Sequence, residues 1–60
     1  MDYTICRDLC IQAIIDAGEK TEIYIELGLS NIADQLCKDL KDFRWEAYYD
    51  GDGFYTLKKL

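Results

Sequence analysis

The chain has 60 residues, half of them apolar, and a formal net charge of −5. We expect a single domain over residues 1–60, whose small core leaves little room for a catalytic cleft. The negative charge disfavours nucleic acids and membrane surfaces as partners, because attraction to phosphate groups needs clustered Lys and Arg. Three cysteines are an odd number for a disulfide framework, and the sequence has no targeting or membrane-spanning segment. We therefore expect reduced thiols and a cytoplasmic protein.

Residues 3–17 have the pattern of a helix, with Asp2 or Thr4 as its N-terminal cap and Gly18 as the left-handed residue that ends it. Helical spacing places most of its apolar side chains on one face. These are Ile5, Cys6, Leu9, Cys10, Ala13, Ile14 and Ala17. We expect this face to pack against the core.

A second apolar stripe, Ile11 and Ile15, lies on another side of the same helix, next to Asp8. A helix that is apolar on two sides is normally covered on two sides. One alternative is that a partner covers the stripe, most simply a second copy in a symmetric homodimer with Asp8 at the rim. The other is that a loop or Leu60 covers it within one chain.

Residues 22–29 alternate along the chain, with Ile23, Ile25, Leu27 and Leu29 on one face. This alternation, together with the β-branched and aromatic content, predicts a strand. A short helix capped by Thr21 is the alternative, since periodicity alone does not decide between the two over eight residues.

Residues 30–43 form the most clearly amphipathic segment of the chain. Ser30 follows a Gly-Leu pair and is a suitable N-terminal cap for a helix, because its hydroxyl can accept from a free amide of the first turn. At helical spacing the apolar residues fall on one arc and the polar ones fall opposite. The apolar arc consists of Ile32, Ala33, Leu36, Cys37, Leu40 and Phe43.

Residues 44–60 predict a β-hairpin, because Gly and Asp in residues 50–53 tolerate the positive φ angles of tight turns. A turn centred on Gly51-Asp52 would pair Tyr49 with Phe54, and both hairpin faces would then carry aromatic side chains. One face is expected to meet a partner, since aromatic residues anchor interfaces. We predict that this is the face with Trp45, Tyr49 and Phe54; Tyr48 and Tyr55 are the alternative.

Residues 21–60 resemble the winged helix-turn-helix family. The resemblance rests on Leu27-Gly28-Leu29-Ser30, on the amphipathic helix that follows, and on a hairpin ending in Tyr55-Thr56-Leu57. It implies a helix before the Gly-Leu-Ser turn, a second helix that reads DNA, and a wing with its tip at residues 50–53. The side chains that would then face the major groove are Asn31, Asp34, Gln35 and Lys38.

Residues suited to catalysis or metal binding are scarce. The chain has no histidine and only three cysteines, whereas a structural zinc site needs four ligands. Asp50 and Asp52 resemble the start of a calcium loop, but no glutamate follows Gly53 to complete it. No nucleophile is paired with a base. We therefore expect neither a catalytic site nor a cofactor or metal.

We predict an α+β domain in the order helix, strand, helix, β-hairpin, with both helices packed on one side of a small antiparallel sheet; a winged helix is the alternative. For its function we expect a small acidic regulator or inhibitor that docks on a larger host or viral protein, such as a nucleic-acid-binding one, and that a phage or mobile element encodes. The alternative function is that of a winged-helix transcriptional regulator, with DNA as the partner.

Overall fold

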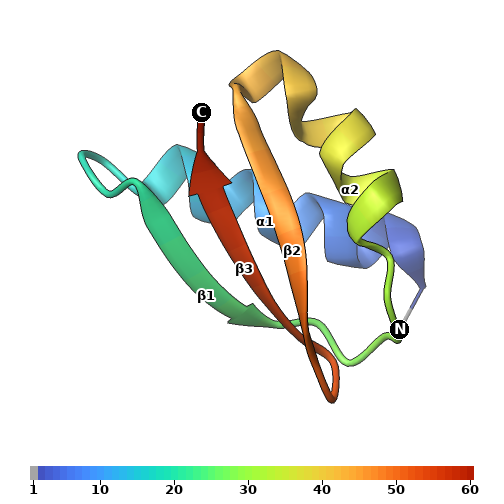
Figure 1. Ribbon diagram of the computed structural model, residues 1–60. Coiled ribbons are helices and arrows are strands. Elements are labelled where there is room, and N and C mark those ends of the chain that lie inside the picture. The colour runs from blue at the N-terminus through green and yellow to red at the C-terminus, as the bar shows by residue number, and fades with distance from the viewer. Residues whose placement is uncertain (1) are drawn as a thin grey trace.

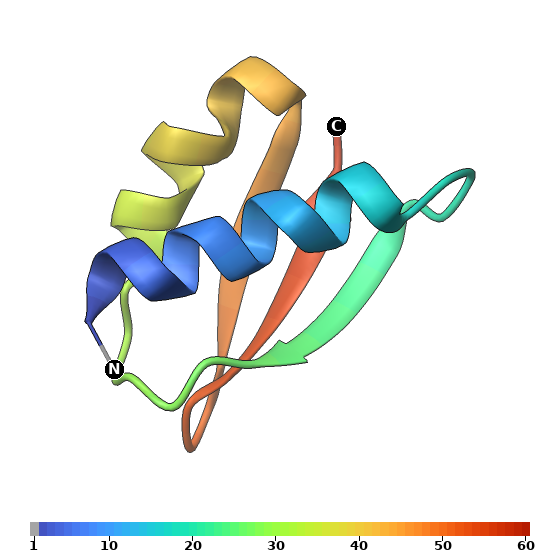
Figure 2. The same ribbon diagram turned by 180° about the vertical axis from the view of Figure 1, so that it is seen from behind.

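The structure, a computed structural model, describes residues 2–60 and confirms the predicted α+β architecture. Two helices accompany a three-stranded antiparallel sheet in the strand order β1-β3-β2, so the last strand is the central one. Both helices lie on the same side of the sheet, and its other side is left bare (Figure 1, Figure 2). The elements are α1 (Tyr3–Asp16), β1 (Glu22–Glu26), α2 (Ala33–Leu40), the 3-10 turn η1 (Lys41–Phe43), β2 (Trp45–Gly51) and β3 (Phe54–Lys59).

Helix α1 begins and ends as predicted. The carboxylate of Asp2 accepts a hydrogen bond from the backbone N–H of Ile5 at 3.1 Å, and Gly18 takes a left-handed conformation with φ +62° just after the helix. The hydroxyl of Tyr3 donates to the Asp39 carboxylate and so ties the start of α1 to α2.

The structure confirms most of the predicted apolar face of α1 and corrects two of its residues. Small side chains, those of Cys6, Cys10 and Ala17, are buried at the centre of the contact, whereas Ile5 and Leu9 are exposed. The helix is apolar almost all the way round, so its sequence leaves the rotation about its axis open. Small residues at the contact allow the helix backbone to approach the sheet closely, and the larger Ile5 and Leu9 then lie on the flank.

Strand β1 confirms the predicted strand. Ile23 and Ile25 are half-buried on the side of the helices, whereas Tyr24 between them is exposed on the bare side. The strand pairs only with β3, in a register that places Tyr24 beside Thr56. The segment before the Gly-Leu-Ser turn is therefore extended, where the winged-helix resemblance implies a helix.

Helix α2 begins later than predicted, at Ala33, and Ser30 does not cap it. The buried hydroxyl of Tyr55 instead fixes the segment that precedes the helix. It accepts from the N–H of Ile32 at 3.0 Å and donates to the carbonyl of Leu29 at 2.8 Å. The side chain of Asn31 accepts from the N–H of Ala33 at 3.0 Å. These contacts satisfy the amides that a helical first turn would otherwise leave free.

The hairpin turn lies one residue later than predicted. Asp52 and Gly53 occupy the turn with φ angles of +53° and +81°, as a two-residue loop with positive φ at both positions requires. A β-bulge at Asp50 then shifts the register, so that Tyr49 faces Tyr55 and not Phe54. A shift of one residue moves every later side chain to the opposite face of the sheet.

This shift overturns the predicted exposed face of the hairpin. Trp45 is only 4% exposed and Tyr49 is half-buried, because both point toward the helices together with Tyr55 and Leu57. Of the three residues predicted to be exposed there, Phe54 alone is exposed. The bulge thus gathers the apolar residues of both hairpin strands on one face, as a sheet covered on one side needs.

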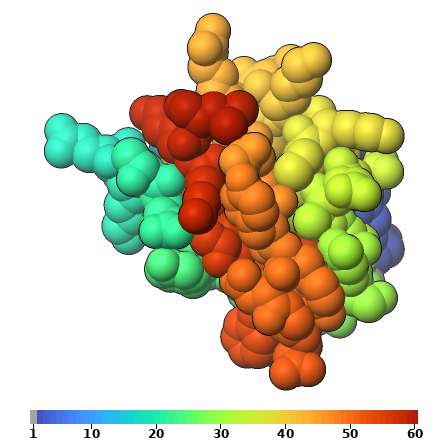
Figure 3. Space-filling model, in the orientation of Figure 1, coloured from blue at the N-terminus to red at the C-terminus, as the bar shows by residue number. Residues whose placement is uncertain are grey.

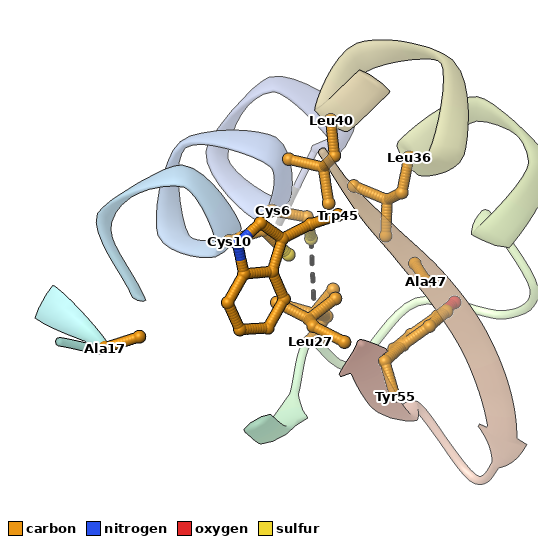
Figure 4. Close-up of a cluster of buried hydrophobic side chains, with 10 residues drawn as sticks. Cys6, Cys10, Ala17, Leu27, Leu36, Leu40, Trp45, Ala47 and Tyr55 are labelled. Atoms are coloured by element: carbon orange, nitrogen blue, oxygen red, sulfur yellow. Dashed lines mark hydrogen bonds between the residues drawn. The ribbon is translucent and has the colours of Figure 1, made fainter. Parts of the chain in front are cut away.

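The core lies between the sheet and the two helices (Figure 4). Its fully buried side chains include Leu36 and Leu40 from α2 and Leu57 from β3. The Cys6 thiol donates a hydrogen bond to the Leu27 carbonyl at 3.5 Å, and Cys10 and Cys37 are free thiols.

Burial of the Cys10 thiol predicts a loss of stability in alkali. Removal from water raises the pKa of Cys10 from 9.0 to about 12. Below pH 9 the thiol is neutral in both states; above it the unfolded chain loses its proton first, so the free energy of unfolding falls as the pH rises toward 12. Urea unfolding at several pH values measures this. Cys10→Ala should be less stable at neutral pH yet show a shallower alkaline decline; an equally steep decline would contradict the assignment.

Candidate functional site

The bare side of the sheet, here called the open face, is the candidate site. No helix crosses it, and β2 and β3 occupy the centre of its surface (Figure 3). Pairing of the strands arranges its side chains in three rows. From β1 through β3 to β2 these are Glu22, Lys58 and Glu46; then Tyr24, Thr56 and Tyr48; then Glu26, Phe54 and the bulged Asp50.

Three aromatic side chains stand out from the open face. Tyr24 is 74% exposed, Tyr48 is 45% exposed and Phe54 is 47% exposed. Thr56 lies between the two tyrosines in the central row and is buried, although no helix covers it. Exposed aromatic side chains on a rigid sheet are suited to anchor a binding partner, because they bury a large area at a small cost in conformational entropy.

The open face is acidic. It has the four carboxylates of Glu22, Glu26, Glu46 and Asp50, and Lys58 is its only cation. The ammonium group of Lys58 lies 3.7 Å from the Glu22 carboxylate and 5.4 Å from the centre of the Tyr48 ring. One central cation thus leaves most of the negative charge at the rim without a counter-charge.

The hydroxyl groups of the open face are tied to these carboxylates. Tyr48 donates to Glu46, and Thr56 donates to Asp50 with a distance of 2.6 Å between the oxygens. The hydrogen bond to Glu46 raises the pKa of Tyr48, and the negative charge of Glu22 raises the pKa of Tyr24. Both tyrosines therefore stay neutral at physiological pH and present an apolar ring with a polar tip.

The open face has no cavity among the residues described. No pocket is found in residues 2–60, and this part of the chain has no group of three or more His, Cys, Asp or Glu side chains that could hold a metal ion. None of the helices described is long and apolar enough to cross a membrane. Exposed aromatic anchors without a concave site fit a macromolecule better than a small ligand.

The sequence-predicted residues of α1 do not form one exposed ridge. Ile11 is half-buried and packs against the core, whereas Ile15, one turn later, is 63% exposed. Asp8 is exposed, and its carboxylate pairs with Arg7 at 3.1 Å. The predicted stripe therefore splits: Ile11 helps to cover the core, and Ile15 alone remains at the surface.

The predicted interface leaves out Tyr24 and includes Tyr48 only in its alternative face. The sequence does indicate that Tyr24 is an exposed aromatic residue, because it lies between Glu22 and Glu26 on the polar side of an alternating strand. Tyr48 was named only as the alternative, and the bulge at Asp50 separates it from Tyr55, which is buried.

The two edges of the sheet differ. Beside β2, the Cys37 thiol of α2 accepts from the N–H of Ala47 at 3.2 Å and lies 3.3 Å from the Ala47 carbonyl, to which it donates. The middle of that edge is therefore occupied. Beyond β1 no other element follows (Figure 1).

The fold and the open face define a small acidic α+β protein whose sheet is covered on one side only. Comparison with protein-family models, with curated proteins and with solved structures gives no significant match.

Proposed function

We propose that this protein is a small regulator or inhibitor that docks through its open face on a basic surface of a larger protein. The observation that carries the proposal is the combination on one face of the sheet of three exposed aromatic side chains with four carboxylates and a single cation. Aromatic anchors provide affinity, and the acidic rim provides steering and selectivity for a partner of opposite charge. A nucleic-acid-binding protein of a host or virus has such a surface, and a phage or mobile element as the source fits the small size.

The chain-wide charge supports this choice of partner. The net charge of −5 adds long-range attraction toward a basic protein and repulsion from nucleic acids. Lys58 lies on the central strand at one end of the open face, near Tyr48, so the carboxylates of Glu26 and Asp50 at the other end of the sheet are left to meet cations of a partner.

Replacing the three anchors with serine tests the proposal. The variant Tyr24→Ser, Tyr48→Ser, Phe54→Ser should stay folded, because these side chains lie outside the core, but it should lose its partner. Affinity capture from a lysate of the source cells, followed by mass spectrometry, compares it with the unmodified protein. We expect a basic protein that the parent retains and the variant loses, with at least tenfold weaker binding when the pair is purified.

A matched control replaces three exposed apolar residues of α1, Ile5, Leu9 and Ile15, with serine. It removes a comparable amount of exposed apolar surface from the opposite side of the molecule. The control should keep the partner, and raised salt should release it. If the control loses the same protein as the open-face variant, or if the captured protein is acidic, the proposal fails.

The alternative function is that of a winged-helix transcriptional regulator. It is favoured by the hairpin that follows the amphipathic helix, as the resemblance over residues 21–60 implies. On α2, Asp34 and Gln35 are exposed beside Lys38, so the surface that would read DNA offers little positive charge. Titration of labelled duplex DNA at low and moderate salt decides: salt-sensitive binding at micromolar concentration or tighter would establish the alternative in place of docking on a protein.

Self-association through Ile15 is a separate proposal, motivated by its exposure on α1. Ile15→Asp would abolish a homodimer formed there and leave the fold intact, since the side chain is outside the core. Sedimentation equilibrium of both proteins measures this. A parent protein that is monomeric at high concentration would rule the homodimer out.

A further inference from the structure

The outer edge of β1 has free backbone hydrogen-bonding groups. At the two ends of its pairing with β3, the N–H of Lys59 donates to the Thr21 carbonyl at 2.9 Å and the N–H of Leu27 donates to the Gly53 carbonyl at 2.8 Å. Alternation along an antiparallel ladder then turns the N–H and C=O groups of every second residue, including Tyr24, away from β3.

These outward groups belong to the same residues whose side chains lie on the open face. Glu22, Tyr24 and Glu26 direct their backbone groups to the edge and their side chains to the bare side of the sheet. An added strand would therefore extend the open face, because each of its three rows would gain one more side chain. The edge of β2 offers no such place at its middle, because Cys37 occupies both polar groups of Ala47.

The negative charge at the β1 edge determines which kind of strand can pair with it. Pairing with β1 of a second copy across a two-fold axis at Tyr24 would bring Glu22 of each chain opposite Glu26 of the other. Like charges directly opposite each other on neighbouring strands are destabilising, so the edge disfavours its own copy. A strand with Lys or Arg opposite these two glutamates would instead form a pair of opposite charge at Glu26 and share Glu22 with Lys58, whose ammonium group lies 3.7 Å away.

We propose that a basic, extended segment of the partner adds to β1 as a fourth antiparallel strand, with cations opposite Glu22 and Glu26 and a small or β-branched residue opposite Tyr24. The inference rests on the proposed function and specifies how the partner is held. Backbone hydrogen bonds at the edge provide affinity for any added strand, whatever its sequence. The two glutamates favour strands with basic side chains.

A synthetic peptide tests strand addition directly. The probe is acetyl-Thr-Lys-Val-Thr-Val-Lys-Thr-amide, whose two lysines and central threonine share one face. NMR titration of isotope-labelled protein reports both affinity and place. At saturation, exchange of the amide protons of Glu22, Tyr24 and Glu26 with solvent should slow at least tenfold, whereas exchange at Ala47 on the other edge should not change.

Two N-methylated versions of the peptide form a matched pair. In the proposed register the N–H of the central threonine points at Tyr24, and those of the valines point away. N-methylation of that threonine should weaken binding at least tenfold, whereas N-methylation of one valine should change it by about twofold or less. Equal losses from the two changes, or slowed exchange nowhere along β1, would overturn strand addition.

Charge selection is tested on the protein itself. The variant Glu22→Gln, Glu26→Gln should bind the lysine peptide roughly three- to thirtyfold more weakly, as expected for the loss of two exposed ion pairs. Asp34→Asn, Asp42→Asn has the same net charge and should bind as the parent does. A peptide with glutamate in place of lysine should not bind. Equal binding of both peptides would overturn the choice of a basic segment.

These outcomes are separate from those of the proposed function. If the anchor variant loses a basic partner but the peptide fails to protect the edge, docking on the open face stands and strand addition falls. If the peptide protects the edge but no basic protein depends on Tyr24, Tyr48 and Phe54, strand addition stands and the proposed docking surface falls.

Discussion

Gly53→Ala is expected to lower the free energy of unfolding by about 2–4 kcal/mol, most of the ~3–5 kcal/mol that a core of this size supplies. Gly53 has a φ of +81°, and a Cβ atom there would lie 2.9 Å from the Gly28 Cα. Neither backbone moves easily, because the Gly53 carbonyl accepts hydrogen bonds from the N–H groups of both Leu27 and Gly28. The variant should be largely unfolded at 37 °C.

Urea unfolding followed by Trp45 fluorescence measures this effect, since the buried indole becomes exposed on unfolding. Gly51→Ala is the matched control. It has a φ of +95° in the same hairpin, but a Cβ atom there meets nothing within 4 Å, so only backbone strain of about 1 kcal/mol is expected. Equal losses from the two substitutions would show that the contact between Gly53 and Gly28 contributes nothing.

Tyr55→Phe is expected to lower the free energy of unfolding by about 2 kcal/mol although only one oxygen is removed. That oxygen is buried, accepts from the N–H of Ile32 and donates to the Leu29 carbonyl. Without it both backbone groups lose their partner. Urea unfolding gives the stability, and faster exchange of the Ile32 amide proton with solvent would place the loss at the start of α2.

Tyr49→Phe serves as the control for Tyr55→Phe. Its ring packs on that of Tyr55, with 5.0 Å between the ring centres, and it is half-buried in the same cluster. No hydrogen bond of the Tyr49 hydroxyl to residues 2–60 is found, so its removal should change stability by less than about 0.5 kcal/mol. A loss as large as that of Tyr55→Phe would mean that the change of ring, and not the lost hydrogen bonds, matters.

The elements with local signals were predictable from the sequence. The start of α1 at Asp2, its end before Gly18 and the strand β1 all follow from capping and alternation within a few residues. The α+β class follows in turn, because two helices and a hairpin with one further strand have few ways to share a single core.

The hairpin register was not predictable in the same way. Residues 50–53 offer two positions for the turn, Gly51-Asp52 and Asp52-Gly53, and both satisfy the rule for positive φ. The choice depends on a tertiary effect: only with the bulge at Asp50 do Trp45 and Tyr55 reach the same side of the sheet. The exposed face of the hairpin depends on this choice. A turn at Gly51-Asp52 predicts that Trp45 lies at the surface, whereas the observed turn and bulge bury it.

The orientation of α1 was also beyond the sequence. Apolar residues lie on nearly every side of this helix, so periodicity does not tell Ile5 and Leu9 from Cys6 and Cys10. Close packing against the sheet favours the small side chains at the contact, and that preference exists only once the sheet is in place.

The contact between Cys37 and Ala47 also bears on how far the protein can assemble. Molecules whose sheet has two free edges can pair edge to edge without limit, as the molecules in a fibril do. Here the Cys37 thiol bonds both backbone polar groups of Ala47 at the middle of the β2 edge, so the β1 edge is the one with an uninterrupted row of free backbone groups. A strand added at β1 therefore meets no equally open edge on the far side of the sheet, which disfavours growth of the pairing beyond one partner.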